Sequence, residues 1–155
     1  MLIGNIEKHG RWWVAECEIV GGFTQGRSRT EAMKNLAEVV ELRVAKPGFE
    51  VKVRDLEKHG RNSFSVLLDP SEPAWLAAAV LRHQRCRHQL SLADVAKSLR
   101  TASRNAYASY EHGAREPTLG KFRELLGAVA PEMTLILGPR SRKRSRLSRR
   151  RLHLE

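Results

Sequence analysis

Residues 91–113 read SLADVAKSLRTASRNAYASYEHG and decide the second half of the fold. Ser91 suits the N-cap of a first helix, and Asp94, three positions later, completes a weak capping box. Apolar residues then recur at helical spacing, at Leu92, Val95, Ala96 and Leu99. Ser103 suits the N-cap of a second helix, and Gly113 suits its C-terminus because glycine tolerates positive φ. The stretch therefore predicts two short helices joined by a tight turn.

The second of these helices has an apolar face and a polar face. The residues expected inside are Ala106, Tyr107 and Tyr110, and those expected outside are Arg104, Asn105 and Ser109. An exposed first turn with Arg and Asn is how a helix-turn-helix motif reads the major groove, because Arg pairs with guanine and Asn with adenine through two hydrogen bonds. We expect Arg104 and Asn105 to read bases, with Ser109 as a third candidate.

Residues around the helix pair are expected to hold phosphates without reading sequence, and these are Ser91, Arg100, Ser103 and Arg115. The alternative is an ordinary helical hairpin with a solvated polar face. The small Ala96, the tyrosine pair and the sequence REPTL at 115–119 favour DNA binding over that alternative.

The same stretch resembles the Xre/Cro-like helix-turn-helix family in the patterns S-L-x-x-V-A-x-x-L, S-R-N-x-Y-x-x-Y-E-x-G and R-E-P-T-L. The resemblance implies that Arg85, near the end of the preceding helix, pairs with Glu111 and orients the recognition helix. The chain departs from the family at Arg100, where most members have Gly, and has one residue more before the recognition helix.

The first seventy residues predict strands around one helix. The expected strands cover 3–6, 12–19, 23–25, 49–56 and 63–68, and a capping box at 28–31 opens a helix that ends at 46–48. The pentapeptide Glu-Lys-His-Gly-Arg occurs at 7–11 and again at 57–61, between strands each time. Both copies are expected to be hairpin turns.

This half resembles the HicB antitoxin domain. The matching residues are Trp13, Ala15, Gly22, Thr24, Gln25, Gly26, Glu31, Ala32, Asn35 and Leu36. Some members of that family carry an Xre-like domain, and the segments 107–111 and 130–135 look like that subgroup. The resemblance implies a type II toxin–antitoxin pair. The first half would bind a small HicA-type toxin, an mRNA interferase, and cover its RNA-cleaving site, and the second would repress the operon by binding operator DNA.

The expected fold class is α+β, with a partial RNase H-like β-β-β-α-β-(β) domain followed by an all-α helix-turn-helix domain. The expected boundaries are 1–69 for the first domain, 70–74 for a linker, 75–138 for the second domain and 139–155 for a basic, disordered tail. A helix is expected over 119–129. The apolar run 133–137 is expected to be a strand that pairs with its copy in a homodimer or higher homo-oligomer.

The net charge of +11 is uneven. Residues 1–70 contain 11 basic and 10 acidic residues. Residues 71–138 contain 9 basic and 6 acidic residues, and residues 139–155 contain 8 basic residues and 1 acidic residue. The pI of about 10.5 therefore comes mainly from the tail. No apolar run is long enough to span a bilayer, the N-terminus has no signal-peptide pattern, and the two cysteines fall in different halves. We expect a bacterial cytoplasmic protein, located on the nucleoid when it is bound to DNA, with reduced thiols and no membrane partner.

No cofactor, metal or catalytic residue is expected. His83, Cys86 and His88 lack a fourth ligand nearby, and the acidic residues of the first half fall on solvated faces rather than in a metal-binding cluster. Trp12 and Val14, apolar on the strand face opposite the core, are the candidate toxin-binding residues. Two alternatives remain: a stand-alone repressor whose first domain senses a ligand or oligomerises, and an RNA-binding protein or nuclease.

Overall fold

A computed structural model describes residues 1–100 and 103–135, and within them it contains one five-stranded antiparallel sheet and five α-helices. The expected α+β class is confirmed. The expected basic tail and the end of the expected second domain, from residue 136 onward, lie outside the described residues, as do Thr101 and Ala102 in the turn of the helix pair.

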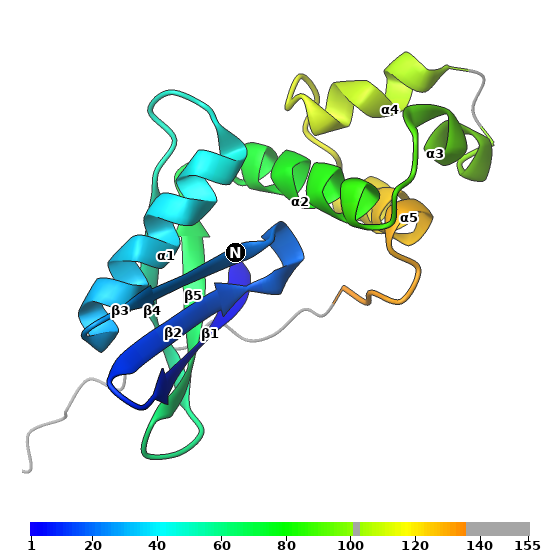
Figure 1. The fold of residues 1–155 in the computed structure, drawn as a ribbon. Coiled ribbons are helices and arrows are strands. Elements are labelled where there is room, and N and C mark those ends of the chain that lie inside the picture. Colours follow the sequence, from blue (N-terminus) through cyan, green and yellow to red (C-terminus); the bar gives the residue numbers. More distant parts are fainter. Residues whose placement is uncertain (101–102, 136–155) are drawn as a thin grey trace, which may run out of the picture.

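The sheet is built from β1 (Leu2–His9), β2 (Trp12–Cys17), β3 (Gly22–Gly26), β4 (Val51–Lys58) and β5 (Ser63–Pro70). Its spatial order is β3-β2-β1-β5-β4, and neighbouring strands are antiparallel throughout. In the register, Ile6 lies opposite Ala15 on one side and Phe64 on the other. Two hairpins, β1–β2 and β4–β5, therefore turn at the same end of the sheet (Figure 1).

Two expected boundaries are corrected. Strand β2 ends at Cys17 and a 3-10 turn, η1 (Glu18–Val20), follows, so Ile19 is outside the strand. Strand β5 continues to Pro70, which lies opposite Val51 in the edge pairing, and the next helix already begins at Pro73. The expected linker 70–74 is therefore reduced to Ser71 and Glu72.

Helix α1 (Arg29–Val44) covers one face of the sheet with Ala32, Leu36, Val40 and Val44, which are all buried. The approach is close: a Cβ on Gly26 would lie 2.6 Å from the backbone nitrogen of Ala32. The opposite face is not covered by any helix of the described residues. On that face Ile3 and Phe23 keep 60% and 66% of their surface exposed.

The second half consists of α2 (Pro73–Arg87), α3 (Leu92–Ser98), α4 (Arg104–Glu111) and α5 (Leu119–Val129). Helix α2 lies between the sheet and the other three helices (Figure 1). Its buried Gln84 donates from Nε2 to the carbonyl oxygen of Ile19 at 2.8 Å, and Arg87 pairs with Glu18 at 2.9 Å. Helix α2 therefore packs on the first half as well as under the α3–α4 pair, and the core is continuous across both halves.

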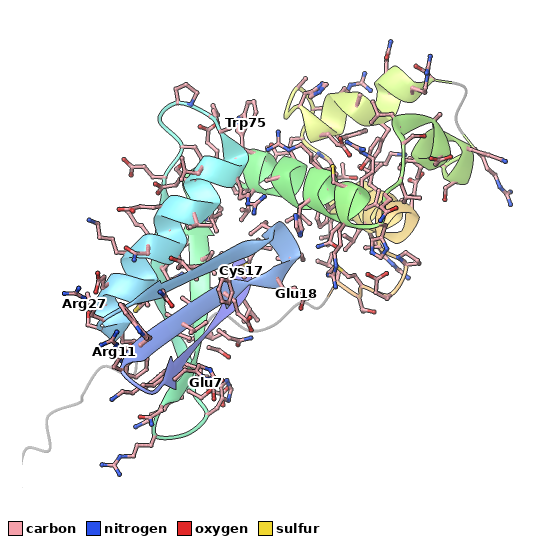
Figure 2. All side chains as sticks on the ribbon, viewed as in Figure 1. Glu7, Arg11, Cys17, Glu18, Arg27 and Trp75 are labelled. Atoms are coloured by element: carbon pink, nitrogen blue, oxygen red, sulfur yellow. The ribbon has the colours of Figure 1, made fainter. Side chains whose placement is uncertain are left out.

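Gly113 ends α4 in the predicted left-handed conformation, with φ of 66°. The amide of Ala114 donates to Ser109 and that of Gly113 to Tyr110, which is the Schellman pattern. A Cβ on Gly113 would lie 2.7 Å from the ring of Trp75, at the start of α2 (Figure 2). The end of α4 is thus fixed against α2 by a contact that only glycine permits.

We expect Gly113→Ala to lower the free energy of unfolding by about 2 kcal/mol, because the side chain is strained at positive φ and meets the Trp75 ring. Urea denaturation measures the loss. Gly127→Ala, in α5 with nothing near its added Cβ, is the matched control and should be neutral or stabilising. Equal midpoints for the two variants would contradict the assigned packing.

Candidate nucleic-acid interface

Helix α3 begins with the predicted capping box. Ser91 Oγ accepts from the amide of Asp94 at 3.1 Å, and Asp94 Oδ2 accepts from the amide of Ser91 at 2.8 Å. The hydrogen bonds from Ser91 hold the pKa of the Asp94 carboxyl below its usual value. Val95 and Ala96 are buried, so α3 presents its inner face to the core as predicted.

Helix α4 buries Tyr107, Ala108 and Glu111, and Tyr110 packs partly against the same core. One prediction here is wrong: Ala106 is exposed rather than inside. Successive helical residues are 100° apart, so a face centred on Tyr107, Ala108 and Glu111 leaves position 106 on the outside. Burial and the neighbouring Glu111 carboxylate raise the pKa of Tyr107, which stays a neutral phenol.

The predicted pair between Arg85 and Glu111 is present and is bidentate. Arg85 Nε donates to Glu111 Oε1 at 2.7 Å and Nη2 donates to Oε2 at 3.0 Å, while Nη1 donates to the carbonyl of Leu90 at 2.9 Å. The carboxylate raises the pKa of Arg85 above its ordinary value. The Glu111 side chain is only 3% exposed, so the fork fixes the rotation of α4 relative to α2.

Fixing that rotation leaves the predicted base-reading residues outside. Arg104 and Asn105 are both exposed in the first turn of α4. Ser109 is half-buried, and its hydroxyl donates to the carbonyl of Ala106 at 2.9 Å, so in this structure it lies along its own helix. Arg104 and Asn105 are therefore better placed than Ser109 to reach a base edge.

The predicted phosphate contacts are also on the surface of this half. Ser91 and Ser103 are the N-caps of α3 and α4, and both are exposed. Arg100, also exposed, has φ of 52°, the left-handed region that favours glycine. Arg115 is exposed just beyond the end of α4.

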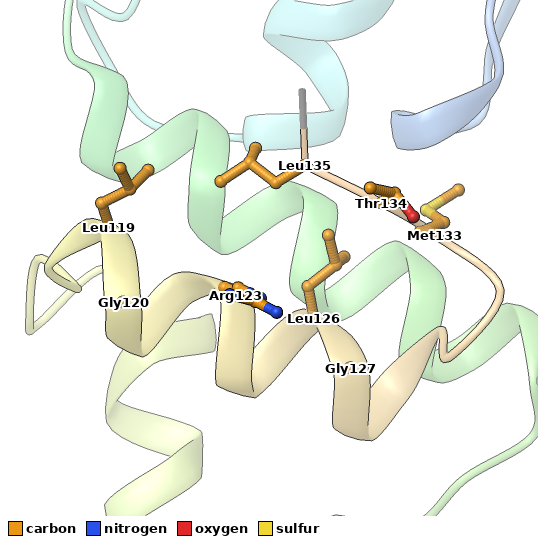
Figure 3. A pocket seen from close by; sticks show the side chains of 8 residues that line it. All are labelled: Leu119, Gly120, Arg123, Leu126, Gly127, Met133, Thr134 and Leu135. Atoms are coloured by element: carbon orange, nitrogen blue, oxygen red, sulfur yellow. The ribbon is translucent and has the colours of Figure 1, made fainter. Parts of the chain in front are cut away.

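The apolar run that begins at Met133 does not form a strand where it is described. Residues 133–135 run back along α5, and Met133 packs partly against the core. The segment and one face of α5 enclose a hollow of about 570 Å³ (Figure 3). Its walls are Leu119, Gly120, Arg123, Leu126, Gly127, Met133, Thr134 and Leu135. The rest of the strand predicted over 133–137, residues 136–137, lies outside the described part of the chain.

The remaining candidates are dispersed. No group of three or more His, Cys, Asp or Glu side chains able to hold a metal occurs within residues 1–100 and 103–135. His88 pairs with Glu132 at 2.9 Å, and the pKa of His83 is lowered by burial and by Arg43 and Arg87. Trp12 and Val14 are half-buried on the open sheet face, far from α3 and α4.

Comparison of the chain with family models, curated proteins and solved structures gives no significant match. None of the helices described is long and apolar enough to cross a membrane.

We expect Glu111→Gln to lower the free energy of unfolding by about 2–4 kcal/mol, because Arg85 then loses the charge that compensates its partial burial. The double variant Arg85→Met/Glu111→Leu should recover most of that loss by replacing the pair with apolar packing. Chemical denaturation of the three proteins measures this. A double variant less stable than Glu111→Gln would contradict a mainly orienting role for the pair.

Proposed function

We propose that this chain is an antitoxin-type repressor. In this proposal α4 reads operator DNA, and the first half binds a small RNA-cleaving toxin of the HicA type. The observation that carries the proposal is the Arg85–Glu111 fork, which holds α4 with Arg104 and Asn105 turned outward. A solvated hairpin has no need of a buried ion pair to set the rotation of its second helix.

The dimensions of α4 suit the major groove. An α-helix with its side chains is about 10–12 Å across, which fits the roughly 12 Å width of that groove in B-DNA. The eight residues of α4 extend roughly 12 Å along the helix axis. Consecutive Arg and Asn side chains in the first turn can hydrogen-bond to neighbouring base pairs. Two base-reading side chains give little affinity alone, so the proposal includes a homodimer that reads two half-sites about 34 Å apart.

The operator experiment compares two Arg-Asn dipeptides of the same chain. Arg104→Ala/Asn105→Ala should abolish specific binding to a fragment from upstream of the gene, because each lost bidentate contact costs about 1–3 kcal/mol. Arg61→Ala/Asn62→Ala, which removes the same groups from an exposed turn of the first half, should bind that duplex like the wild type. Titrations by anisotropy at moderate salt measure both.

If the 104/105 variant binds the duplex as tightly as the 61/62 variant, α4 is not the reading helix. Inverting one half-site of a palindromic fragment should weaken binding of the wild type as strongly as deleting it. Insensitivity to that inversion would remove the dimer from the proposal.

The proposal that the first half binds a toxin is supported by the open face of the sheet, which is the face opposite α1. Ile3 and Phe23 are largely exposed there, and Val14 lies on the same face between Glu7 and Gln25 in the register. Exposed apolar side chains gathered on one uncovered sheet face are typical of a protein-binding surface. The nearby carboxylates of Glu7 and Glu16 suit a partner that is itself cationic because it binds RNA.

We expect Val14→Asp to weaken the complex with a small protein encoded beside this gene by at least tenfold, because the aspartate stays unpaired in the contact. Operator affinity should not change. Thr30→Asp, exposed on α1 away from that face, is the control. Calorimetric titration measures the two affinities. If no neighbouring product binds the wild type while operator binding persists, the stand-alone repressor is the better description.

A further inference from the structure

The two copies of Glu-Lys-His-Gly-Arg lie at the same end of the sheet, on either side of β5. Each copy begins in a strand, β1 or β4, and only its last residues lie in the hairpin turn that was expected of the whole pentapeptide. The antiparallel order places the ends of β1, β3 and β4 and the starts of β2 and β5 at one end of the sheet, which we call the turn end (residues 8–12, 26–29 and 58–64). The amide of Lys8 donates to the carbonyl of Asn62 at 2.9 Å, which joins the end of β1 to the turn between β4 and β5. The basic residues of both copies therefore lie at the same end of the sheet.

Five exposed cations gather at the turn end: Lys8, Arg11, Arg27, Lys58 and Arg61. Across residues 1–100 and 103–135, no ion pair involves any of their side chains. A sixth cation, Arg29, is paired with Asp55 at 2.9 Å. The acidic Glu7 pairs with His9 at 3.4 Å rather than with one of the five. The carboxylate of Glu31 accepts from the backbone amide of Arg27 at 2.7 Å and offsets part of the charge there, and the turn end as a whole remains positively charged.

Aromatic rings lie beside these cations on both faces of the sheet, Trp12 on the open face and Trp13 and Phe64 on the face that α1 covers. The Arg11 guanidinium carbon lies 5.3 Å from the centroid of the Trp12 ring, and the Lys8 ammonium lies 5.9 Å from that of Trp13. The centroids of the Phe64 and Trp13 rings are 6.0 Å apart, and the guanidinium carbon of Arg29 lies 4.4 Å from the centroid of the Phe64 ring. Basic groups interleaved with aromatic rings are the composition of surfaces that hold phosphates and stack bases.

A hollow of about 340 Å³ opens at this end, and its walls are Arg11, Trp12 and Arg27. Figure 2 shows Arg11 and Arg27 together at the end of the sheet farthest from Glu18 and the second half. We propose that the turn end binds single-stranded nucleic acid. One base stacks in the hollow against Trp12, Arg11 and Arg27 hold the flanking phosphates, and Lys58 and Arg61 continue the phosphate track.

The geometry favours a single strand over the other partners considered for this chain. The turn end offers hairpin turns, and helix α1, which begins there, is packed along the sheet and cannot enter a major groove, so this end does not suit duplex reading. An RNA-cleaving toxin is itself cationic where it binds RNA, so five unpaired cations would repel it. The turn end and the α3–α4 pair lie at opposite ends of the molecule (Figure 1), and this inference does not depend on the proposed operator binding.

The test uses the full chain and fluorescein-labelled 12-nucleotide strands, oligo(U) and oligo(dT), in anisotropy titrations over a range of salt. Arg11→Ser/Arg27→Ser should bind about tenfold more weakly, and the slope of log affinity against log salt should fall by about 1.4, for two lost phosphate contacts. Trp12→Ala should also lose about tenfold but keep its salt slope, because a stacking contact releases no counterion. Loss of affinity for either strand type supports the site, and comparison of the two strands shows whether the sugar is read.

Lys34→Ser/Lys52→Ser removes two exposed cations from elsewhere in the same half and is the matched control. Every variant should retain the circular dichroism spectrum and the thermal midpoint of the wild type, which shows that it is folded. The Trp12 indole N–H resonance, assigned from its loss in Trp12→Ala, should shift when oligo(U) is added, whereas that of Trp75 should not.

Affinities equal to the control variant, or an unmoved Trp12 resonance while the strand binds, would overturn the proposal. The proposal would also be overturned if these variants lost affinity for an acidic protein and kept their affinity for the oligonucleotides. Failure of Arg104→Ala/Asn105→Ala to reduce duplex binding would affect only the operator proposal.

Discussion

Two consecutive side chains of α2 connect the structure. Gln84 donates to the carbonyl of Ile19 in the first half, and Arg85 donates to Glu111 in α4. Because neighbouring helical residues point about 100° apart, one turn of α2 reaches both halves at once. Gln84 and Glu111 are almost fully buried, and a buried polar group left without its partner costs about 1–3 kcal/mol. The same turn of α2 therefore fixes the orientation of both the sheet and α4.

This arrangement constrains how the two proposed activities can influence one another. Only Ser71 and Glu72 separate β5 from α2, and Lys46 at the end of α1 pairs with Glu72. The chain therefore lacks a flexible tether here, and the halves form one packed body with a continuous core. A protein bound to the open sheet face can alter DNA affinity only through a differential effect on the packing of α2, or by changing how two copies are spaced.

The sequence predicted features whose cause is local, and a family resemblance supplied one that is not. The capping box at Ser91 and the left-handed Gly113 follow from capping preferences and a C-terminal glycine, whereas the Arg85–Glu111 pair was expected only because the stretch resembles the Xre/Cro-like family. The contact of Gln84 could not be predicted, because its partner is a backbone carbonyl 65 residues away, and no side-chain type marks a carbonyl. The face of α4 was misjudged at Ala106 because an alanine carries almost no hydrophobic signal to assign it to either side.

The turn end shows why net charge is a poor guide to a binding surface. Residues 1–70 carry a net charge of only +1, yet five unpaired cations meet at one end of their sheet. Their acidic counterparts are distributed along α1, on the open face, in β4 and near α2, and one of them, Glu31, accepts from the backbone amide of Arg27 at 2.7 Å. Over a Debye length of about 8 Å at physiological salt, a ligand responds to the charges near it and not to the sum over the domain. The local electrostatic potential is therefore determined by the positions of the hairpin turns, which depend on strand register. It is not determined by the composition of the domain.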